Sequence, residues 1–130
     1  MSYRRIDEVG RLFVYGTLKR GFSNAAKLEG AVFEGRVVTR RGYALHLVSG
    51  YPALTTSEDG VVSGELYSVT DEHLVELDAF EVVPHRYQRE AIVLSDGSKA
   101  QAYVVAESVV RGSATIGGGE FLEATVDRVE

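Results

Sequence analysis

The strongest constraint on the fold is a series of short apolar segments separated by turn-forming residues. Each segment is long enough for a strand, and glycine, serine and aspartate interrupt the chain between them. The segments are Arg11–Tyr15, Ala31–Thr39, Tyr43–Val48, Pro52–Thr55, Val61–Val69, Tyr87–Leu94 and Gln101–Ala106. This pattern predicts a closed or nearly closed sheet with a few helices packed around it.

Two segments have the features of helices. Thr70 is a candidate N-cap, and the two acidic residues that follow it complement the positive helix start, so a helix of about three turns is expected there. A shorter helix is expected at 25–28, with Ser23 or Asn24 as its cap and Gly30 as its end.

The composition is that of a folded domain. The chain has 130 residues, of which 45% are hydrophobic and 25% charged. This is long enough for one domain with a substantial core and too short for two ordinary domains. We therefore predict a single domain over 1–130, with peripheral, partly irregular segments at 1–10 and 107–130. The second of these is expected to be a loop with a late strand or a frayed end.

Charge and cysteine usage exclude several function classes. The chain has no cysteine, which excludes disulfides, thiolate metal sites and cysteine nucleophiles. A net charge of -5 argues against a nucleic-acid surface, although 11 of the 14 basic residues are arginine. No metal-ligand spacing connects His46, His73 and His85, and no apolar segment is long enough for a membrane span. We expect a cytoplasmic protein without metal, cofactor, membrane or nucleic-acid partners.

The loop after the first predicted strand has the features of a ligand-binding loop. Gly16 can adopt a positive φ and has no side chain to block close approach, so neighbouring N–H groups can converge on an anion. Thr17 adds a hydroxyl group. The alternative is an ordinary tight turn after a strand.

Glu81 is the candidate general base. Counting about 100° per residue from Leu74 places Glu81 on the apolar stripe that Leu74 forms with Leu77. A carboxyl group that faces the core at the negative end of a helix holds its proton more tightly than a solvated one. The alternative is that the helix ends at Phe80, and that Glu81 faces solvent or pairs with an arginine such as Arg86 or Arg89.

An ordered set of motifs resembles the γ-glutamylcyclotransferase superfamily, and most of all its γ-glutamylamine cyclotransferase or AIG2-like branch. The motifs are Tyr-Gly-Thr-Leu at 15–18, Leu-Asp-Ala-Phe-Glu at 77–81, Pro84, and Tyr-Gln-Arg at 87–89. Each motif alone is weakly specific, but their order over residues 11 to 105 is more so.

The resemblance implies an α+β fold built on a small mixed β-barrel with flanking helices. It implies an enzyme that releases 5-oxoproline and a free amine or amino acid from a small γ-glutamyl amide, without a cofactor. Glu81 would be the catalytic acid/base. The substrate-binding residues would be Tyr15, Gly16, Thr17, Leu18 and Tyr87.

The remaining motif residues are expected to have supporting roles. Tyr87 would orient the substrate or Glu81, or be a core aromatic with a satisfied hydroxyl group. Arg89 is expected to pair with an acid in the barrel wall. Asp78 is expected to make a hydrogen bond that orders the motif.

Two rival functions remain open. The first is a noncatalytic small-molecule-binding domain of the AIG2-like type, because a fold does not fix an activity. The second is a hydrolase that uses Asp78 and Glu81 as paired carboxylates, although the chain has no tryptophan for sugar stacking. The sequence sets neither the leaving amine nor the oligomeric state.

Overall fold

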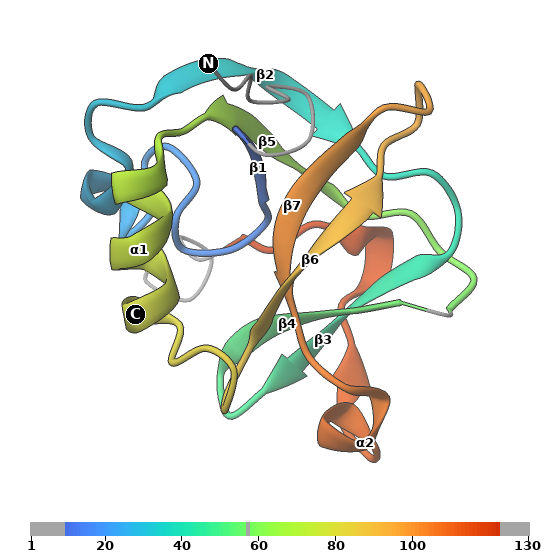
Figure 1. Cartoon of the computed structure of the whole chain (residues 1–130). Coiled ribbons are helices and arrows are strands. Elements are labelled where there is room, and N and C mark those ends of the chain that lie inside the picture. The colour runs from blue at the N-terminus through green and yellow to red at the C-terminus, as the bar shows by residue number, and fades with distance from the viewer. Residues whose placement is uncertain (1–9, 57, 123–130) are drawn as a thin grey trace.

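The protein is built around one curved sheet, which the computed structural model describes together with its helices over residues 10–56 and 58–122. Within these residues eight strands follow the order β2-β5-β1-β7-β4-β3-β8, with β6 paired to β7. The strands are β1 (Arg11–Val14), β2 (Val32–Val38), β3 (Tyr43–Val48), β4 (Tyr51–Thr56), β5 (Ser63–Ser68), β6 (Gln88–Val93), β7 (Lys99–Val104) and β8 (Ala114–Thr115). Parallel and antiparallel pairings coexist, and the sheet curls into a half-barrel (Figure 1). The predicted small mixed barrel is confirmed.

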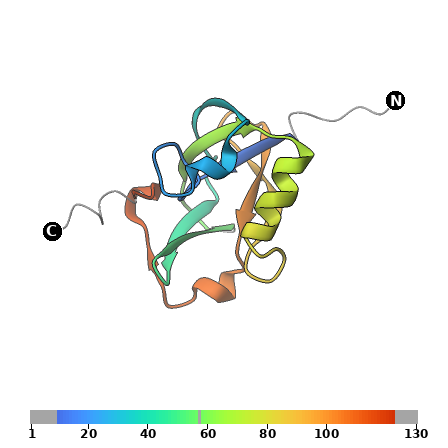
Figure 2. The same ribbon diagram turned by 90° about the vertical axis from the view of Figure 1, so that its left-hand side faces the viewer.

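The helices lie on the outside of the sheet. They are α1 (Asp71–Phe80) and α2 (Glu107–Val110), with 3-10 turns η1 (Ala25–Leu28) and η2 (Gly117–Gly119). Figure 2 shows η1 and α1 next to each other on one flank, with α2 at another end of the molecule. The Nε2 atom of His73 lies 3.1 Å from the Glu29 carbonyl oxygen, which joins the end of η1 to α1.

The start of α1 agrees with the predicted cap. The Thr70 hydroxyl accepts the His73 backbone N–H at 3.1 Å, and His73 Nδ1 accepts the Thr70 N–H at 3.1 Å. The two bonds together satisfy donors that a helix start leaves free. His73 is therefore a structural, hydrogen-bonded histidine.

Strand β1 is buried on both faces, which explains its nearly unbroken apolar sequence. One face, with Leu12 and Val14, packs with Leu74 and Leu77 of α1. The other face, with Phe13, points into the barrel core. The strand that carries the candidate loop is thus held between two apolar clusters.

Strand β7 pairs with three strands, β1, β4 and β6, and this branching of the sheet determines where a cavity can form. Strand β6 pairs with β7 at six positions, so β1 and β4 must share the opposite edge. There β1 pairs at Gln101 and β4 pairs at Val104. The end of β1 and the start of β4 therefore diverge from the same edge and leave space between them.

The C-terminal segment returns to the barrel. It forms α2, the short strand β8 and η2, so a late strand is present as expected, whereas α2 was not predicted. Phe121 is buried in the barrel core, and its carbonyl oxygen accepts a hydrogen bond from Lys19 Nζ at 2.8 Å. The predictions for residues 1–9 and 123–130 lie outside the described residues.

Candidate active site

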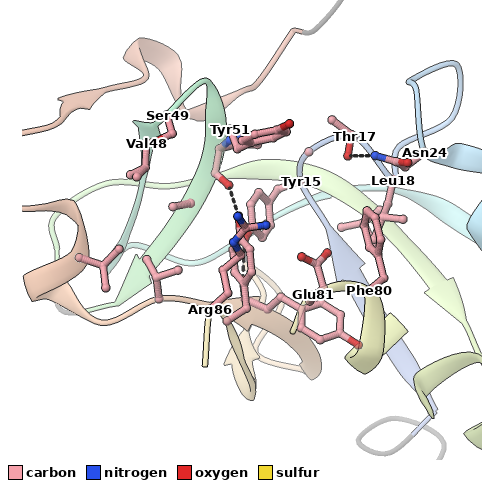
Figure 3. Close-up of a pocket in the computed structure, with 18 of the residues that line it drawn as sticks. Tyr15, Thr17, Leu18, Asn24, Val48, Ser49, Tyr51, Phe80, Glu81 and Arg86 are labelled. Carbon is pink, nitrogen blue, oxygen red and sulfur yellow. Dashed lines mark hydrogen bonds between the residues drawn. The ribbon is translucent and has the colours of Figure 1, made fainter. Parts of the chain in front are cut away.

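A cavity of about 370 Å³ opens where β1 and β4 diverge. All six predicted site residues line it: Tyr15, Gly16, Thr17, Leu18, Glu81 and Tyr87. They come from three regions of the chain, namely the loop after β1, the end of α1 and the segment before β6. Figure 3 shows the Glu81 carboxylate pointing into the space beneath the loop. The sequence motifs therefore converge on one site.

The loop after β1 contains a β-turn over residues 16–19. The Lys19 N–H donates to the Gly16 carbonyl at 3.1 Å, which makes Thr17 and Leu18 the central residues of the turn. The N–H groups of central residues make no hydrogen bond within such a turn, so both are available to a ligand. Asn24 Nδ2 donates to the Thr17 hydroxyl at 2.8 Å and fixes its position. Asn24 precedes η1 but makes no side-chain cap there.

Position 16 needs glycine because of a close contact with Pro52, and not because of its backbone angle. Its φ lies outside the left-handed region, so the expectation of a positive φ is wrong. A Cβ atom at this position would lie 2.7 Å from Cγ of Pro52 in β4, well inside van der Waals contact. The absence of a side chain thus lets the loop approach β4 closely, whereas the expected approach of an anion to the loop stays a prediction.

Glu81 lies at the C-cap of α1, and its side chain enters the cavity. Its backbone N–H donates to the Leu77 carbonyl at 2.8 Å, which continues the helical geometry by one residue. Within the described residues its carboxylate has no hydrogen-bond or ion-pair partner. Burial raises the pKa of Glu81 to about 7, against a smaller lowering effect from the nearby Arg86 guanidinium. The helix does end at Phe80, yet Glu81 does not turn away from the core.

Tyr15 and Tyr87 line the cavity together with Glu81. The Tyr15 hydroxyl donates to the Tyr103 carbonyl at 2.6 Å, where the sheet branches between the β1 and β4 pairings. The Tyr87 hydroxyl donates to the Pro52 carbonyl at 3.0 Å. Burial raises the pKa of Tyr15 well above its usual value and that of Tyr87 to about 12, so both remain protonated donors at neutral pH.

Asp78 and Arg89 form a separate pair near the cavity. Arg89 Nε and Nη2 donate to the two Asp78 carboxylate oxygens at 2.8 and 3.0 Å, and the Tyr103 hydroxyl donates to Asp78 at 2.7 Å. The expectation that Arg89 pairs with a barrel-wall acid is wrong, because its partner lies on α1. Arg89 is also absent from the cavity lining, whereas Asp78 has the ordering role expected of it.

A tight turn after α1 brings the next functional segment back to the cavity. Val82 has a φ of 56°, in a region that β-branched residues rarely adopt. Its carbonyl accepts the backbone N–H groups of His85 and Arg86 at 2.8 and 2.9 Å. The chain therefore reverses direction, and Arg86 and Tyr87 face the same cavity as Glu81.

Several lining residues were not predicted. Val48, Ser49 and Tyr51 line the cavity from the β3–β4 hairpin, and Arg86 lines it from the turn after α1. Ser49 and Gly50 have φ values of 52° and 85°, as a two-residue hairpin turn requires. The Ser-Gly pair between two apolar segments is a signal that indicates such a hairpin.

The described residues contain no group of three or more histidine, cysteine or acidic side chains that is arranged to hold a metal ion. None of the helices described is long and apolar enough to cross a membrane.

The only charged side chains that line the cavity in the described part of the chain are Glu81 and Arg86. A partly buried carboxyl group with a raised pKa, together with turn N–H groups that make no hydrogen bond within their turn, suits proton transfer next to a bound anion.

Comparisons with known proteins point to the family that the sequence motifs resemble. Residues 12–123 match the family model described as "Gamma-glutamyl cyclotransferase, AIG2-like". A Vibrio cholerae protein whose name assigns it provisionally to the gamma-glutamylcyclotransferases is 37% identical over 97 residues, covering 75% of this chain and 83% of that protein. The rat gamma-glutamylaminecyclotransferase is 36% identical over 93 residues, covering 65% of this chain and 62% of the rat protein.

A solved structure supports the same assignment. The crystal structure of a mouse AIG2-like protein superimposes with a TM-score of 0.69 at 31% sequence identity. The alignment covers 78% of this chain and 82% of the mouse chain. The half-barrel with flanking helices is therefore the architecture that this chain shares with it.

Proposed function

The chain belongs to the AIG2-like gamma-glutamyl cyclotransferase family, and from this premise we propose that it releases 5-oxoproline and a free amine or amino acid from a small γ-glutamyl amide. The observation that carries the proposal is the Glu81 carboxylate, which faces the cavity without a hydrogen-bond or ion-pair partner among the described residues and has a pKa raised to about 7. A general base works best when its pKa lies near the working pH.

The proposed reaction needs no external nucleophile. The α-amino group of the substrate attacks the γ-carbonyl carbon, a new carbon–nitrogen bond closes the five-membered ring, and the original amide bond breaks. Because the amine is mostly protonated at neutral pH, Glu81 first takes one proton from it. The same carboxyl group gives this proton to the departing nitrogen and takes the second proton, which the ring nitrogen loses after the attack. It passes that proton to the departing amine, so that 5-oxoproline and the protonated amine leave and Glu81 is again ionised.

The loop after β1 would hold the anionic part of the substrate. The Thr17 and Leu18 N–H groups in the Gly16–Lys19 turn provide two donors for the α-carboxylate or for the developing oxyanion. Their fixed position opposite Glu81 would place the amine near the carbonyl carbon that it attacks, which lowers the entropic cost of ring closure. Tyr87 would form the wall that limits the substrate's rotation.

The test is 5-oxoproline release from a panel of γ-glutamyl amines and γ-glutamyl dipeptides. We expect release by the wild type and by E76Q, which changes an exposed glutamate on the same helix, and none above background by E81Q. Release by E81Q at the wild-type rate would contradict the assignment of Glu81.

The rival function as a binding domain makes a different prediction in the same panel. It predicts no 5-oxoproline from any substrate, while calorimetry still detects γ-glutamyl ligands bound to the wild type. That combination would overturn the proposed enzymatic activity.

A further inference from the structure

The charge distribution in the cavity leaves one group without a role in the proposed chemistry. Glu81 and Arg86 are the charged side chains among the described residues that line it. Glu81 is assigned to proton transfer, and the loop N–H groups are assigned to the α-carboxylate of the γ-glutamyl group or to the developing oxyanion. The Arg86 guanidinium has no such assignment.

Arg86 is held at the cavity by its backbone while its side chain is uncommitted. Its N–H donates to the Val82 carbonyl at 2.9 Å, which fixes the residue in the turn after α1. Within the described residues its guanidinium has no hydrogen-bond or ion-pair acceptor, unlike that of Arg89, which binds both oxygens of Asp78. Figure 3 shows the Arg86 side chain extending toward Tyr51. A guanidinium in this state is suited to bind a carboxylate in two hydrogen bonds.

The mouth of the cavity near Arg86 is apolar. Tyr51 and Val109 line the cavity but remain 58% and 51% exposed, so they lie where the cavity meets solvent. Val48 of the same hairpin also lines the cavity and is only partly buried. A surface of this kind offers contact area to an apolar side chain of a ligand.

We propose that Arg86 binds the carboxylate of the leaving group, and that the enzyme prefers γ-glutamyl amino acids with an apolar side chain over γ-glutamyl amines that lack a carboxylate. The inference rests on the proposed cyclotransferase function. Arg86 supplies the charge partner, and Val48, Tyr51 and Val109 contact the apolar side chain of the departing amino acid.

Electrostatics favours binding of Arg86 to the leaving-group end of the substrate over binding to its γ-glutamyl end. The attacking amine is bound as an ammonium ion beside Glu81, and a guanidinium placed against the same α-carbon would repel it. The leaving-group carboxylate lies on the far side of the scissile amide bond. Arg86 is exposed and extends toward Tyr51 at the mouth of the cavity, as Figure 3 shows.

The experiment compares two substrates that differ only in the carboxylate. They are γ-glutamyl-leucine and the γ-glutamyl amide of 3-methylbutylamine, which is leucine without its carboxyl group. The proteins are the wild type, R86A, R86K, R86E and the control R40A, which changes an exposed arginine outside the cavity lining. The readout is kcat/KM for 5-oxoproline release as a function of pH.

We expect the wild type to prefer γ-glutamyl-leucine. R86A should lower kcat/KM for that substrate about tenfold, mainly through KM, and change the other substrate less than about twofold. R86K should recover part of the loss, because a lysine keeps the charge but not the planar pair of donors. R86E should reverse the preference, and R40A should match the wild type.

Four other results would overturn the proposal. An equal loss for both substrates in R86A would mean that Arg86 binds the γ-glutamyl carboxylate. An equal shift of both pH profiles without a change in preference would mean that Arg86 acts only on the ionisation of Glu81. Release from both substrates with no preference in the wild type would reject the proposal but keep the cyclotransferase function, whereas no release at all would reject both.

Discussion

Two carboxylates at the end of α1 lie three residues apart and have opposite environments. Asp78 accepts two hydrogen bonds from Arg89 and one from Tyr103. Glu81 faces the cavity and has no such partner among the described residues. Burial disfavours ionisation of Asp78, but the hydrogen bonds from Arg89 and Tyr103 outweigh it and lower its pKa. For Glu81 burial prevails and raises the pKa to about 7.

The difference shows how one short helix end provides both an anchor and a base. Asp78 is ionised at neutral pH and ties α1 to β6 and β7 through Arg89 and Tyr103. That anchor fixes the last turn of the helix, and Glu81 follows immediately. The comparison also disfavours a paired-carboxylate hydrolase, because Asp78 is occupied by its partners and does not line the cavity.

The largest expected effect is on turnover in E81Q. Glutamine has nearly the same shape but cannot accept the proton of the substrate amine, so kcat should fall about a thousandfold. Ligand binding measured by calorimetry should remain within about threefold of wild type if the cavity is intact. The D78N variant serves as the comparison, and an equal loss of kcat in both variants would remove the distinction between the two acids.

The next effect is on the stability of D78N. This substitution leaves Arg89, which is only 26% exposed, without its charge partner, so the free energy of unfolding should fall by about 2 kcal/mol. The lowered pKa of Asp78 means that its contribution is present above the unfolded pKa and is lost as the pH falls. Urea unfolding at pH 7 and pH 3 should therefore show a large difference from wild type only at pH 7.

The same measurement should give the opposite sign for E81Q. The pKa of Glu81 is raised from 4.5 to about 7, so the folded wild type holds a proton that it must release as the pH rises through this window. We expect E81Q to be more stable than wild type by about 2 kcal/mol at pH 8 and equal to it at pH 4. A loss of stability in E81Q at pH 8 would show that the ionised carboxylate has a stabilising partner.

The smallest effect is expected in Y103F. This variant removes one hydrogen bond to Asp78 but leaves both bonds from Arg89 in place. The free energy of unfolding should fall by about 1 kcal/mol, and the pKa of Asp78 should rise toward its usual value. A fall in the free energy of unfolding as large as that of D78N would mean that Tyr103, and not Arg89, provides most of the stabilisation through Asp78.

The sequence was sufficient to predict the strands and α1. Alternating or continuous apolar residues bounded by glycine and serine marked the strands, and the cap at Thr70 marked the start of α1. These signals are local, which is why they can be read from one sequence. Segment ends differ from prediction by a few residues, as in β7, predicted at Gln101–Ala106 and observed at Lys99–Val104.

The partners within the site could not be predicted in the same way. Arg89 pairs with Asp78 because the turn after α1 folds β6 back beside the helix, and no local pattern encodes that contact. The need for glycine at position 16 comes from Pro52, which is distant in sequence. The local sequence suggests Arg86 only as a partner of Glu81, because nothing local shows that its side chain faces a cavity.

The most direct test is a carbon NMR titration of the side-chain carboxyl groups in the ligand-free protein, with E81Q and D78N used to assign the two resonances. We predict a midpoint near pH 7 for Glu81 and a midpoint below the usual 3.8 for Asp78. A Glu81 midpoint near 4.5 would contradict this assignment, because a carboxyl group with an ordinary pKa would not be the desolvated base on which the proposed chemistry depends.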